Sequence, residues 1–435
     1  MSNTSAGRSK WPYVPLTTVA EKIQDGTHFS PLSTSGPFRY VTSRNIRPGY
    51  LDLESCGWIS EREHKAIFRR CDPRYGDILL TKDGANTGNA SINTLHEEIS
   101  LLSSVAMIRT DPTVADGHFV LQYLLSPEGQ TRLTDLVSGN AITRLTLAKI
   151  KAFSIPSAPL PEQRAIAAVL DSLDDAIQKT EQIIAKLQQV KQGLLHDLLT
   201  RGIDDNGELR DPERHPEQFQ DSPLGRIPKG WEVGTVAHWF EVTSGVTLGP
   251  HRIPRYNPKP YLRVANVQRS MLDLSEIAFL EARDAEISNK LLAVGDLLIV
   301  EGHADPREIG RCAIVPPEAT DFTFQNHLFR LRSRSALPSY ALLQLNSAST
   351  RRYWWRTCAT SSGLHTINRA QLARLKIAMA STHEQAAICS LADTTDLRIL
   401  EEERAVGVLR AIRSGLAEDL LYGRVRTTSL PEFSA

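Results

Sequence analysis

Apolar side chains recur at alternating steps of four and three residues over residues 162–200. A mean spacing of about 3.5 is typical of a coiled-coil seam, because two helices with this pattern bury their stripes against each other. No proline interrupts the run, so we predict one continuous helix, roughly 60 Å long at about 1.5 Å per residue. The apolar positions are Ile166, Leu170, Leu173, Ile177, Ile184, Leu187, Leu194 and Leu198, with the polar Thr180 and Lys191 in the same stripe.

The stripe returns over residues 384–422, which align without gaps to 162–200 and share 14 identical residues of 39. The chain is therefore a tandem duplication. Because a whole domain separates the two helices, we predict that they pair antiparallel and act as a spacer; two amphipathic helices on separate cores are the alternative. Gly193 and Gly415 recur within the helical runs, where glycine costs ~1 kcal/mol, and predict close approach of a neighbouring backbone. The second seam reads Ile388, Ala392, Thr395, Ile399, Val406, Leu409, Leu416 and Leu420.

The rest of the chain also repeats, as short apolar runs that follow turn residues. These runs predict strands, and helical patterns follow them near 119–125 and 340–345. The prediction is a mixed α/β fold in which two α/β domains are separated by two long helices, in a pseudo-two-fold repeat. The matching runs are 40–46 with 261–267, 75–80 with 294–299, 88–92 with 310–314, and 105–109 with 328–332.

The expected organisation has six parts. Between the shared strands the two domains differ most in their loops, which is where recognition residues usually lie. The segments are domain 1 over 1–158, spacer helix 1 over 159–202, a linker over 203–222, domain 2 over 223–380, spacer helix 2 over 381–424 and a tail over 425–435.

Composition narrows the class of protein. The chain has 435 residues, of which 41% are hydrophobic. No apolar run approaches the ~18 residues that a membrane span requires. Its first ten residues lack the apolar stretch of a signal peptide. The five cysteines are scattered without a Cys-x-x-Cys pair, so they support neither a zinc cluster nor a disulfide framework. We expect a cytoplasmic protein with no membrane partner.

The formal net charge of zero conceals an uneven distribution. Residues 223–380 carry 20 basic and 13 acidic side chains, and residues 1–160 carry 17 and 15, whereas the helices and the link lean acidic. Basic domains suggest that the domains bind a polyanion, and the acidic helices and link suggest that these segments bind a protein partner. No catalytic constellation is present: residues 84–89 lack the Gly-Lys-Ser/Thr of a phosphate loop, and Asn257-Pro258-Lys259-Pro260 lacks the aromatic residue of amino-methyltransferases.

The whole chain resembles the specificity subunit of type I restriction-modification systems. One departure is Ser381-Thr382-His383 before the second Glu-Gln, where the family has Pro-Leu-Pro, so we expect partner contacts to differ there. The motifs that carry the resemblance are Pro159-Leu160-Pro161-Glu162-Gln163-Arg164-Ala165-Ile166, the helix end from Gly193 to Gly202, Trp11-Pro12, Asp25-Gly26-Thr27-His28, and the run from Leu224 to Trp231.

This resemblance implies a non-catalytic subunit that reads a bipartite, asymmetric site in double-stranded DNA, one half with each domain. It also implies two modification subunits, which bind S-adenosylmethionine and methylate N6 of adenine, and restriction subunits that use ATP and Mg²⁺. No cofactor is expected in this chain. A coiled-coil DNA-binding adaptor or regulator, not linked to methylation, is the alternative.

Candidate contact residues are polar or basic side chains in the predicted loops, because Arg and Asn suit the edges of guanine and adenine while Lys and Thr suit phosphates. In domain 1 they are Thr27, His28, Arg44, Asn45, Lys82, Asn86, Thr87, Asn89 and Arg144; in domain 2 they are Ser244, Arg263, Asn266, His303, Arg311, Asn326 and His365. The candidates for contact with the modification subunits are Glu162, Gln163, Asp171, Asp174, Glu384, Gln385, Asp393 and Asp396.

Overall fold

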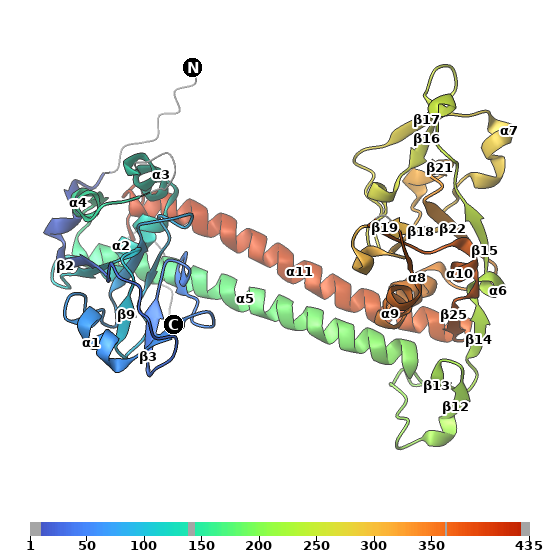
Figure 1. Ribbon diagram of the computed structural model, residues 1–435, viewed down its shortest axis with the longest axis horizontal. Coiled ribbons are helices and arrows are strands. Elements are labelled where there is room, and N and C mark those ends of the chain that lie inside the picture. The colour runs from blue at the N-terminus through green and yellow to red at the C-terminus, as the bar shows by residue number, and fades with distance from the viewer. Residues whose placement is uncertain (1–9, 138–143, 362, 428–435) are drawn as a thin grey trace. The chain divides into compact units, whose positions relative to one another are not determined.

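The computed structural model describes residues 10–137, 144–361 and 363–427, so the end of the predicted tail, 428–435, lies outside the described residues. The chain forms two compact units. Unit 1 contains Met1–Gln182 and Glu403–Ala435, and unit 2 contains Ile183–Glu402. Two long helices, α5 (Leu160–Thr200) and α11 (Thr382–Leu421), run through both units (Figure 1). Each unit combines one α/β domain with part of both helices.

The domain of unit 1 contains a four-stranded sheet in the order β2-β10-β7-β8 and a three-stranded sheet in the order β6-β3-β9, in which β3 and β9 are parallel. The strands are β1 (Tyr13–Pro15), β2 (Ala20–Asp25), β3 (Phe38–Val41), β4 (Ile46–Arg47), β5 (Tyr50–Leu51), β6 (Gly57–Ile59), β7 (Ile78–Thr81), β8 (Ala90–Ile92), β9 (Ile99–Leu101), β10 (Val105–Thr110) and β11 (Ser154–Pro156); the helices are α1 (Glu61–Phe68), α2 (Gly117–Leu125), α3 (Pro127–Leu136) and α4 (Leu147–Ala152).

The domain of unit 2 repeats this topology, with sheets in the orders β15-β22-β18-β20 and β17-β16-β21. The predicted duplication of the domains is thus confirmed at the level of strand order. The main strands are β14 (Glu232–Thr235), β15 (Phe240–Ser244), β16 (Pro258–Leu262), β17 (Ala278–Glu281), β18 (Leu297–Val300), β20 (Cys312–Ile314), β21 (Thr323–Phe324), β22 (Leu328–Ser333) and β25 (Lys376–Met379). A further sheet joins β19 (Gly302–His303), β24 (Leu364–Thr366) and β23 (Ala359–Ser361), and the helices are α6 (Val236–Trp239), α7 (Asp284–Ile287), α8 (Pro338–Asn346), α9 (Ala348–Thr357) and α10 (Arg369–Arg374). A hairpin of β12 (Phe219–Ser222) and β13 (Gly225–Pro228) precedes this domain.

Equivalent central strands are entered through the same Gly-Asp turn. Gly76 before β7 has φ +87° and Gly295 before β18 has φ +85°, a backbone conformation that glycine adopts without steric cost. The aspartate that follows each glycine is buried and pairs with an arginine of the neighbouring strand: Asp77 with Arg109 at 2.8 Å, and Asp296 with Arg332 at 2.7 Å. Each domain therefore anchors its central turn by one ion pair.

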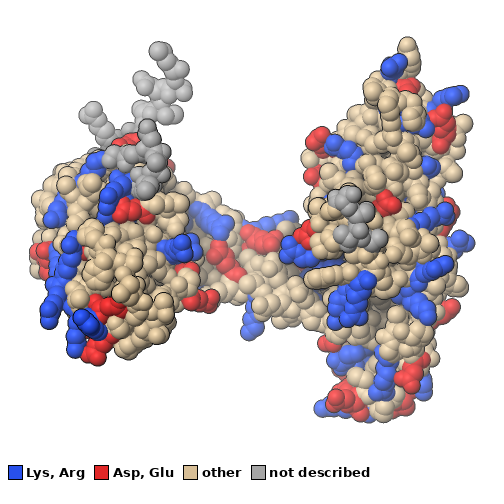
Figure 2. All heavy atoms as spheres, viewed as in Figure 1, with Lys and Arg blue, Asp and Glu red and all other residues tan. Residues whose placement is uncertain are grey.

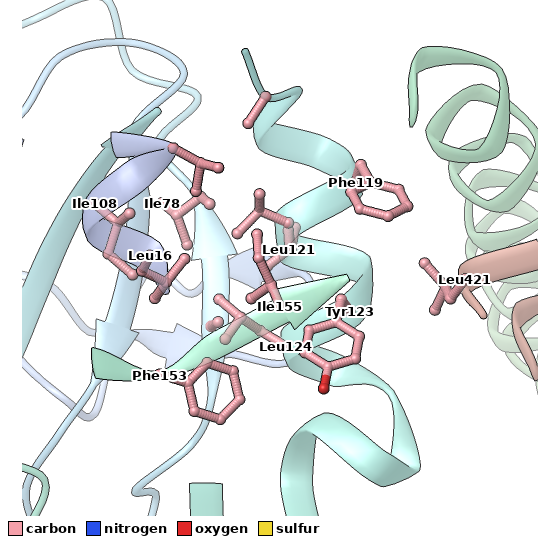
Figure 3. Close-up of a cluster of buried hydrophobic side chains, with 14 of the residues drawn as sticks. Leu16, Ile78, Ile108, Phe119, Leu121, Tyr123, Leu124, Phe153, Ile155 and Leu421 are labelled. Atoms are coloured by element: carbon pink, nitrogen blue, oxygen red, sulfur yellow. The ribbon is translucent and has the colours of Figure 1, made fainter. Parts of the chain in front are cut away.

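The ends of the long helices belong to the domain cores. In unit 1, Leu420 and Leu421 of α11 are fully buried in a cluster with Leu16, Phe119 and other side chains of the domain (Figure 3). In unit 2, Leu198 and Leu199 of α5 pack in the core that contains Ile388 of α11. The helices therefore cannot leave their domains without exposing core leucines, each of which contributes about 1.5–3 kcal/mol by burial.

The two helices pack antiparallel, as predicted from their sequences. In unit 1 the guanidinium of Arg413 on α11 pairs with Asp174 on α5 at 2.9 Å, and in unit 2 Lys191 of α5 pairs with Asp396 of α11. The seam side chains are buried or half-buried throughout, among them Ile166, Leu170, Ile388, Ala392, Ile399, Val406 and Leu420, each at most 8% exposed. No helix among the described residues is both long and apolar enough to cross a membrane.

The two repeated glycines do not mark a close approach within the chain. A Cβ atom at Gly193 or Gly415 would meet no atom within 4 Å, and both positions are exposed. No backbone of this chain therefore makes the close approach that we predicted, and both glycines face away from the seam. Tight glycine positions occur instead where the helices end. Gly202 after α5 has φ +61°, and a Cβ there would lie 2.2 Å from Oε1 of Glu384.

Because Gly193 is an exposed helical glycine with free space around it, Gly193→Ala is expected to stabilise unit 2 by about 0.5–1 kcal/mol. Gly202→Ala is the matched control in the same unit and is expected to destabilise it, since its φ is positive and its Cβ would clash. Urea unfolding of the two variants measures both effects. Destabilisation by Gly193→Ala would show that this glycine does have a required packing neighbour.

A pH-dependent pair links α2 to α5 in unit 1. Nδ1 of His118 lies 2.6 Å from the Asp171 carboxylate, and this hydrogen bond raises the pKa of His118 above 6.5. Burial opposes the ionisation of Asp171, but hydrogen bonds from His118 and Gln122 outweigh it and lower the pKa of Asp171 below 3.8. The stabilisation due to His118 is complete below about pH 6.5 and disappears as pH rises through the pKa of His118 in the folded protein. The stabilisation due to Asp171 disappears as pH falls through the pKa of Asp171 in the folded protein.

The destabilisation caused by His118→Gln is therefore expected to be largest between about pH 4 and pH 6.5 and to shrink on either side. Thermal unfolding of wild type and variant across this range is the measurement. His196→Gln, which alters an exposed histidine of α5, serves as the control and should show no such window. A pH-independent difference between wild type and His118→Gln would contradict the ion pair.

Candidate nucleic-acid interface

Two of the predicted contact residues are asparagines that hold turns together from the inside. Asn45 is 2% exposed; its Oδ1 accepts the backbone N–H of Thr42 and its Nδ2 donates to the carbonyl of Asp52. Asn266 makes the same contacts in domain 2, accepting from the N–H of Arg263 and donating to the carbonyl of Asp273. Their repetition in the sequence thus reflects a shared turn, and neither side chain is available to a ligand in this structure.

Lys82 is also buried, within a cluster of charges at the end of β2. Its Nζ lies 3.5 Å from Asp25 and 3.1 Å from Asp83, and it is 2% exposed. Asp25 is buried as well and pairs with Arg70 at 2.8 Å, while the exposed His28 approaches both Asp25 and Arg70. Lys82 therefore ties the loop after β7 to β2. Thr27, which is buried and accepts the N–H of Phe29, helps to hold the same corner.

The loop of residues 82–89 brings most of the remaining domain 1 candidates onto one face. Asp83 forms a β-bridge and a 3.2 Å ion pair with Arg144, whose side chain is more than half exposed. Asn86 donates to the carbonyl of Ser43, which places this loop beside the exposed Arg44. Thr87 and Asn89 are half-buried in the same loop, where Asn89 donates to the carbonyl of Ile46. His28, Arg44 and Arg144 are the exposed members of this domain 1 face.

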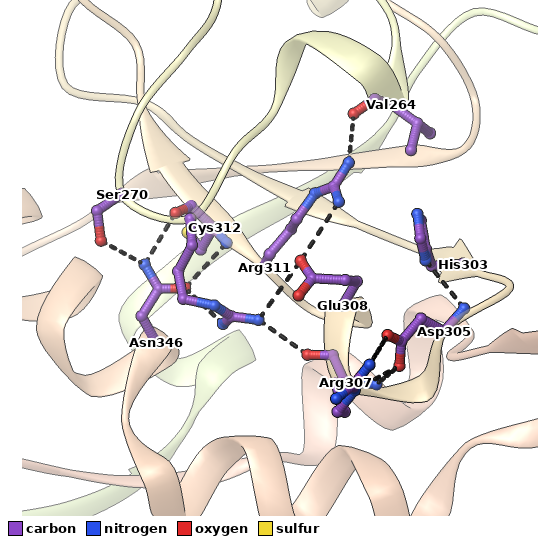
Figure 4. Close-up of polar contacts among 10 residues, drawn as sticks. Val264, Ser270, His303, Asp305, Arg307, Glu308, Arg311, Cys312 and Asn346 are labelled. Carbon is purple, nitrogen blue, oxygen red and sulfur yellow. Dashed lines mark hydrogen bonds and ion pairs between the residues drawn. The ribbon is translucent and has the colours of Figure 1, made fainter. Parts of the chain in front are cut away.

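Domain 2 builds the equivalent face with different residues. Strand β19 pairs with β24 so that Gly302 lies opposite Thr366, at the place where domain 1 has Asp83 and Arg144, and His303 lies opposite His365 one residue further along. Nδ1 of His303 accepts the N–H of Asp305, and Arg307 clamps the same aspartate at 2.7 Å, so that its hydrogen bonds hold the pKa of Asp305 at about 2 (Figure 4). The loop of residues 301–311 is therefore rigidly shaped by its own side chains.

The other domain 2 candidates surround this loop. Arg311 is 7% exposed, bonds to the carbonyl of Val264 and pairs with Glu308, so it supports the loop from inside (Figure 4). Arg263 is half-buried and pairs with Glu276 at 3.1 Å. Ser244 is half-buried in β15, and Asn326 is half-buried with its backbone N–H bonded to Val246.

The Glu-Gln pair at the start of each long helix is buried and engaged within the chain. The carboxylate of Glu162 accepts from Arg426 and from the N–H of Thr427, which follow α11. Glu384 accepts from the N–H of Ile203 and from Arg210, which follow α5, and from the indole of Trp231. Gln163 and Gln385 bond to backbone groups of their own domains.

The aspartates of the helices divide into two groups. Asp171, Asp174 and Asp396 pair with His118, Arg413 and Lys191 respectively. Asp393 is exposed and forms no ion pair within the described parts of the chain. Of the eight residues that we predicted to meet partner subunits, Asp393 is thus exposed without an ion pair among the described residues, and the Glu-Gln pairs serve to dock each helix on its domain.

Sequence reasoning missed a basic helix surface in domain 2. Helix α9 carries three exposed arginines and an exposed tryptophan: Arg351, Arg352, Trp355 and Arg356. The signal was present as the run Arg-Arg-Tyr-Trp-Trp-Arg, but it becomes a surface only when the helical register is known. In Figure 2, Lys and Arg side chains gather on the part of unit 2 where Figure 1 draws α9.

Metal chemistry finds no support in these faces, since the described residues contain no cluster of three or more His, Cys, Asp or Glu side chains placed to hold an ion. What both faces offer is arginine, histidine and amide side chains on firmly held loops. Such groups hydrogen-bond to phosphates and to base edges.

Comparison with known proteins agrees with this chemistry. The family model described as Type I restriction modification DNA specificity domain matches residues 9–189. The specificity subunit of the type I restriction enzyme EcoKI from Escherichia coli (strain K12) is 22% identical over 395 residues, which cover 88% of this chain and 82% of that protein.

Two solved structures share the fold of the chain. The S subunit of a type I restriction-modification system from M. genitalium aligns with a TM-score of 0.53 and 14% identity, covering 100% of this chain and 98% of that chain. A chain from a structure reported on complex assembly and conformational transition of the type I R-M system aligns with a TM-score of 0.60 and 16% identity, covering 95% and 98%. On these grounds residues 9–189 match the type I restriction-modification DNA specificity domain, and the chain over most of its length is similar to the specificity subunits of type I restriction enzymes.

Proposed function

We propose that this subunit reads a bipartite, asymmetric site in double-stranded DNA, one half with each domain, and scaffolds two adenine-N6 methyltransferase subunits together with restriction subunits in the cytoplasm. The observation that carries the proposal is that the two domains present equivalent faces, built around residues 82–89 and 301–311, with different side chains. After the central strand, domain 1 holds Asp83 opposite Arg144, whereas domain 2 holds Gly302 opposite Thr366 at the same position and His303 opposite His365 one residue further along. One scaffold with two sets of contact groups is suited to two different half-sites.

The antiparallel helices support a fixed gap between the half-sites. A continuous helix of 41 residues is roughly 60 Å long, and successive turns of duplex DNA are about 34 Å apart. Because both helices end inside domain cores, the gap would be set by packed leucines rather than by flexible linkers. Methyl transfer belongs to the partner subunits, which would carry S-adenosylmethionine and act on an adenine rotated out of the duplex; the restriction subunits would use ATP and Mg²⁺.

Methylation mapping tests the proposal directly. We expect single-molecule sequencing to find N6-methyladenine in a split, asymmetric motif in cells that express this chain with its methyltransferase. In cells that express the methyltransferase alone, the motif should be unmethylated. Failure to find chain-dependent methylation, although the complex assembles, would instead favour a DNA-binding adaptor that is not linked to methylation.

Matched variants assign each half-site to a domain. Arg144→Gln and His365→Gln change the same bridging segment of the two domains, one residue apart in register, and each is expected to lower discrimination by ~1–3 kcal/mol at bases of its own half-site only. The measurement is the methylation, by the assembled complex, of DNA substrates that carry single-base changes in one half-site or the other. If either variant weakened the methylation of all substrates equally, that side chain would be a phosphate contact.

A further inference from the structure

Helix α9 of unit 2 has two faces of opposite character. Trp354 and Thr350 are 1% and 5% exposed and face the domain, whereas Trp355 is 65% exposed. At about 100° per residue, Arg351, Trp355, Arg352 and Arg356 fall within an arc of about 140° on the outer side. The outer face of α9, defined by these four residues, is thus a continuous basic and aromatic surface.

The three arginines of this face lack counter-charges. None of them forms an ion pair or a side-chain hydrogen bond with any residue that the structure describes, and α9 itself contains no acidic residue. Neighbouring arginines are paired: Arg307 binds Asp305, and Arg269 and Arg311 both approach Glu308. Like charges on one helix face repel each other. An anionic ligand would remove this repulsion.

The outer face of α9 adjoins the recognition face of domain 2. Helix α9 packs against the turn of residues 306–308, and a Cβ at the nearby Gly310 would lie 2.3 Å from the indole nitrogen of Trp354. At its other end, Sγ of Cys358 lies 3.9 Å from Nδ1 of His365. Burial lowers the pKa of Arg269, which hydrogen-bonds to Asn346 and to the carbonyl of Arg307, and repulsion from Arg351 of α9 adds to this effect.

Domain 1 has no such surface at the equivalent place among its described residues. Its α3 contacts the recognition loop in the same way, through a hydrogen bond from Gln130 to the carbonyl of Gly88. The outer residues of α3 include the exposed Asp135, and Arg132 pairs with Glu128 and stacks on Tyr13. A partner that binds the two halves alike would need matching surfaces. The basic face of α9 therefore fits a ligand that is contacted unequally by the two domains.

We propose that the outer face of α9 is a phosphate-binding surface that anchors the DNA backbone beside the half-site of domain 2, independently of base sequence. Guanidinium groups form paired hydrogen bonds with phosphate oxygens, and Trp355 offers a flat apolar surface to the sugars between them. Such contacts set the register of the duplex while the neighbouring loop reads bases. This inference rests on the proposed function, because it takes DNA as the ligand.

The test uses the chain assembled with its methyltransferase and two duplexes, one with the mapped target and one with the domain 2 half-site scrambled. Fluorescence anisotropy over a range of NaCl concentrations gives the slope of log affinity against log salt. Arg352→Ala/Arg356→Ala is expected to reduce that slope by about 0.9 for each phosphate that is no longer neutralised, so by about 1.8 in all. The affinities for the two duplexes should fall by the same factor, which keeps their ratio unchanged.

Two further variants make the result specific. Arg352→Lys/Arg356→Lys retains the charge and should preserve most of the slope. Arg334→Ala/Arg369→Ala removes two exposed arginines beside α6, at another face of the same domain, and should leave the slope unchanged. Since all four positions are exposed, these variants should fold, which thermal unfolding of each complex confirms.

An unchanged salt slope in Arg352→Ala/Arg356→Ala would overturn the inference. Loss of methyltransferase assembly with an unchanged slope would also overturn it and would assign the outer face of α9 to a protein partner. Failure of the proposed function looks different: the wild-type complex itself would then bind the target and the scrambled duplex equally well. The two conclusions can therefore fail separately.

Discussion

Each long helix begins with a glutamate whose buried carboxylate is bonded by the segment that follows the other helix. The carboxylate of Glu162 in α5 accepts a hydrogen bond from Arg426, which follows α11. The carboxylate of Glu384 in α11 accepts one from Arg210, which follows α5. A buried carboxylate without a partner costs several kcal/mol, so the start of one helix and the end of the other must come together in each unit. Antiparallel pairing follows from this constraint, and the leucines at the helix ends then complete the two domain cores.

Duplication supplies two copies of a stable scaffold whose loops differ. The Gly-Asp turn, the buried Asp77–Arg109 and Asp296–Arg332 pairs and the asparagine-centred turns are the same in both copies. Because these interactions stabilise each domain from inside, the outer residues can change without loss of the fold. The Asp83–Arg144 ion pair of domain 1 and the His303–His365 pair in the corresponding segment of domain 2 illustrate this freedom, as do the different outer faces of α3 and α9.

The fold was largely predictable because its signals are periodic and repeated. The seam, the antiparallel pairing and the α/β character all follow from apolar spacing and from the order of turns and strands. The contact residues were harder to predict, because residue type does not reveal which way a side chain points. Lys82, Asn45 and Arg311 have the chemistry of DNA contacts, yet each is buried and bonded within its own domain. The repetition of Asn45 as Asn266 reflected a turn that both domains need.

The sequence by itself determined the class of the protein, the duplication and the two helices, since hydrophobic periodicity and internal identity are properties of the chain alone. Tertiary structure decided which polar groups are structural and which are accessible. Glu162 and Asp171 lie on the same helix, but only the three-dimensional arrangement buries one against the end of α11 and places the other against α2. The basic face of α9 was likewise decided by packing, because burial of Trp354 against the loop at Gly310 turns the arginines and Trp355 outward.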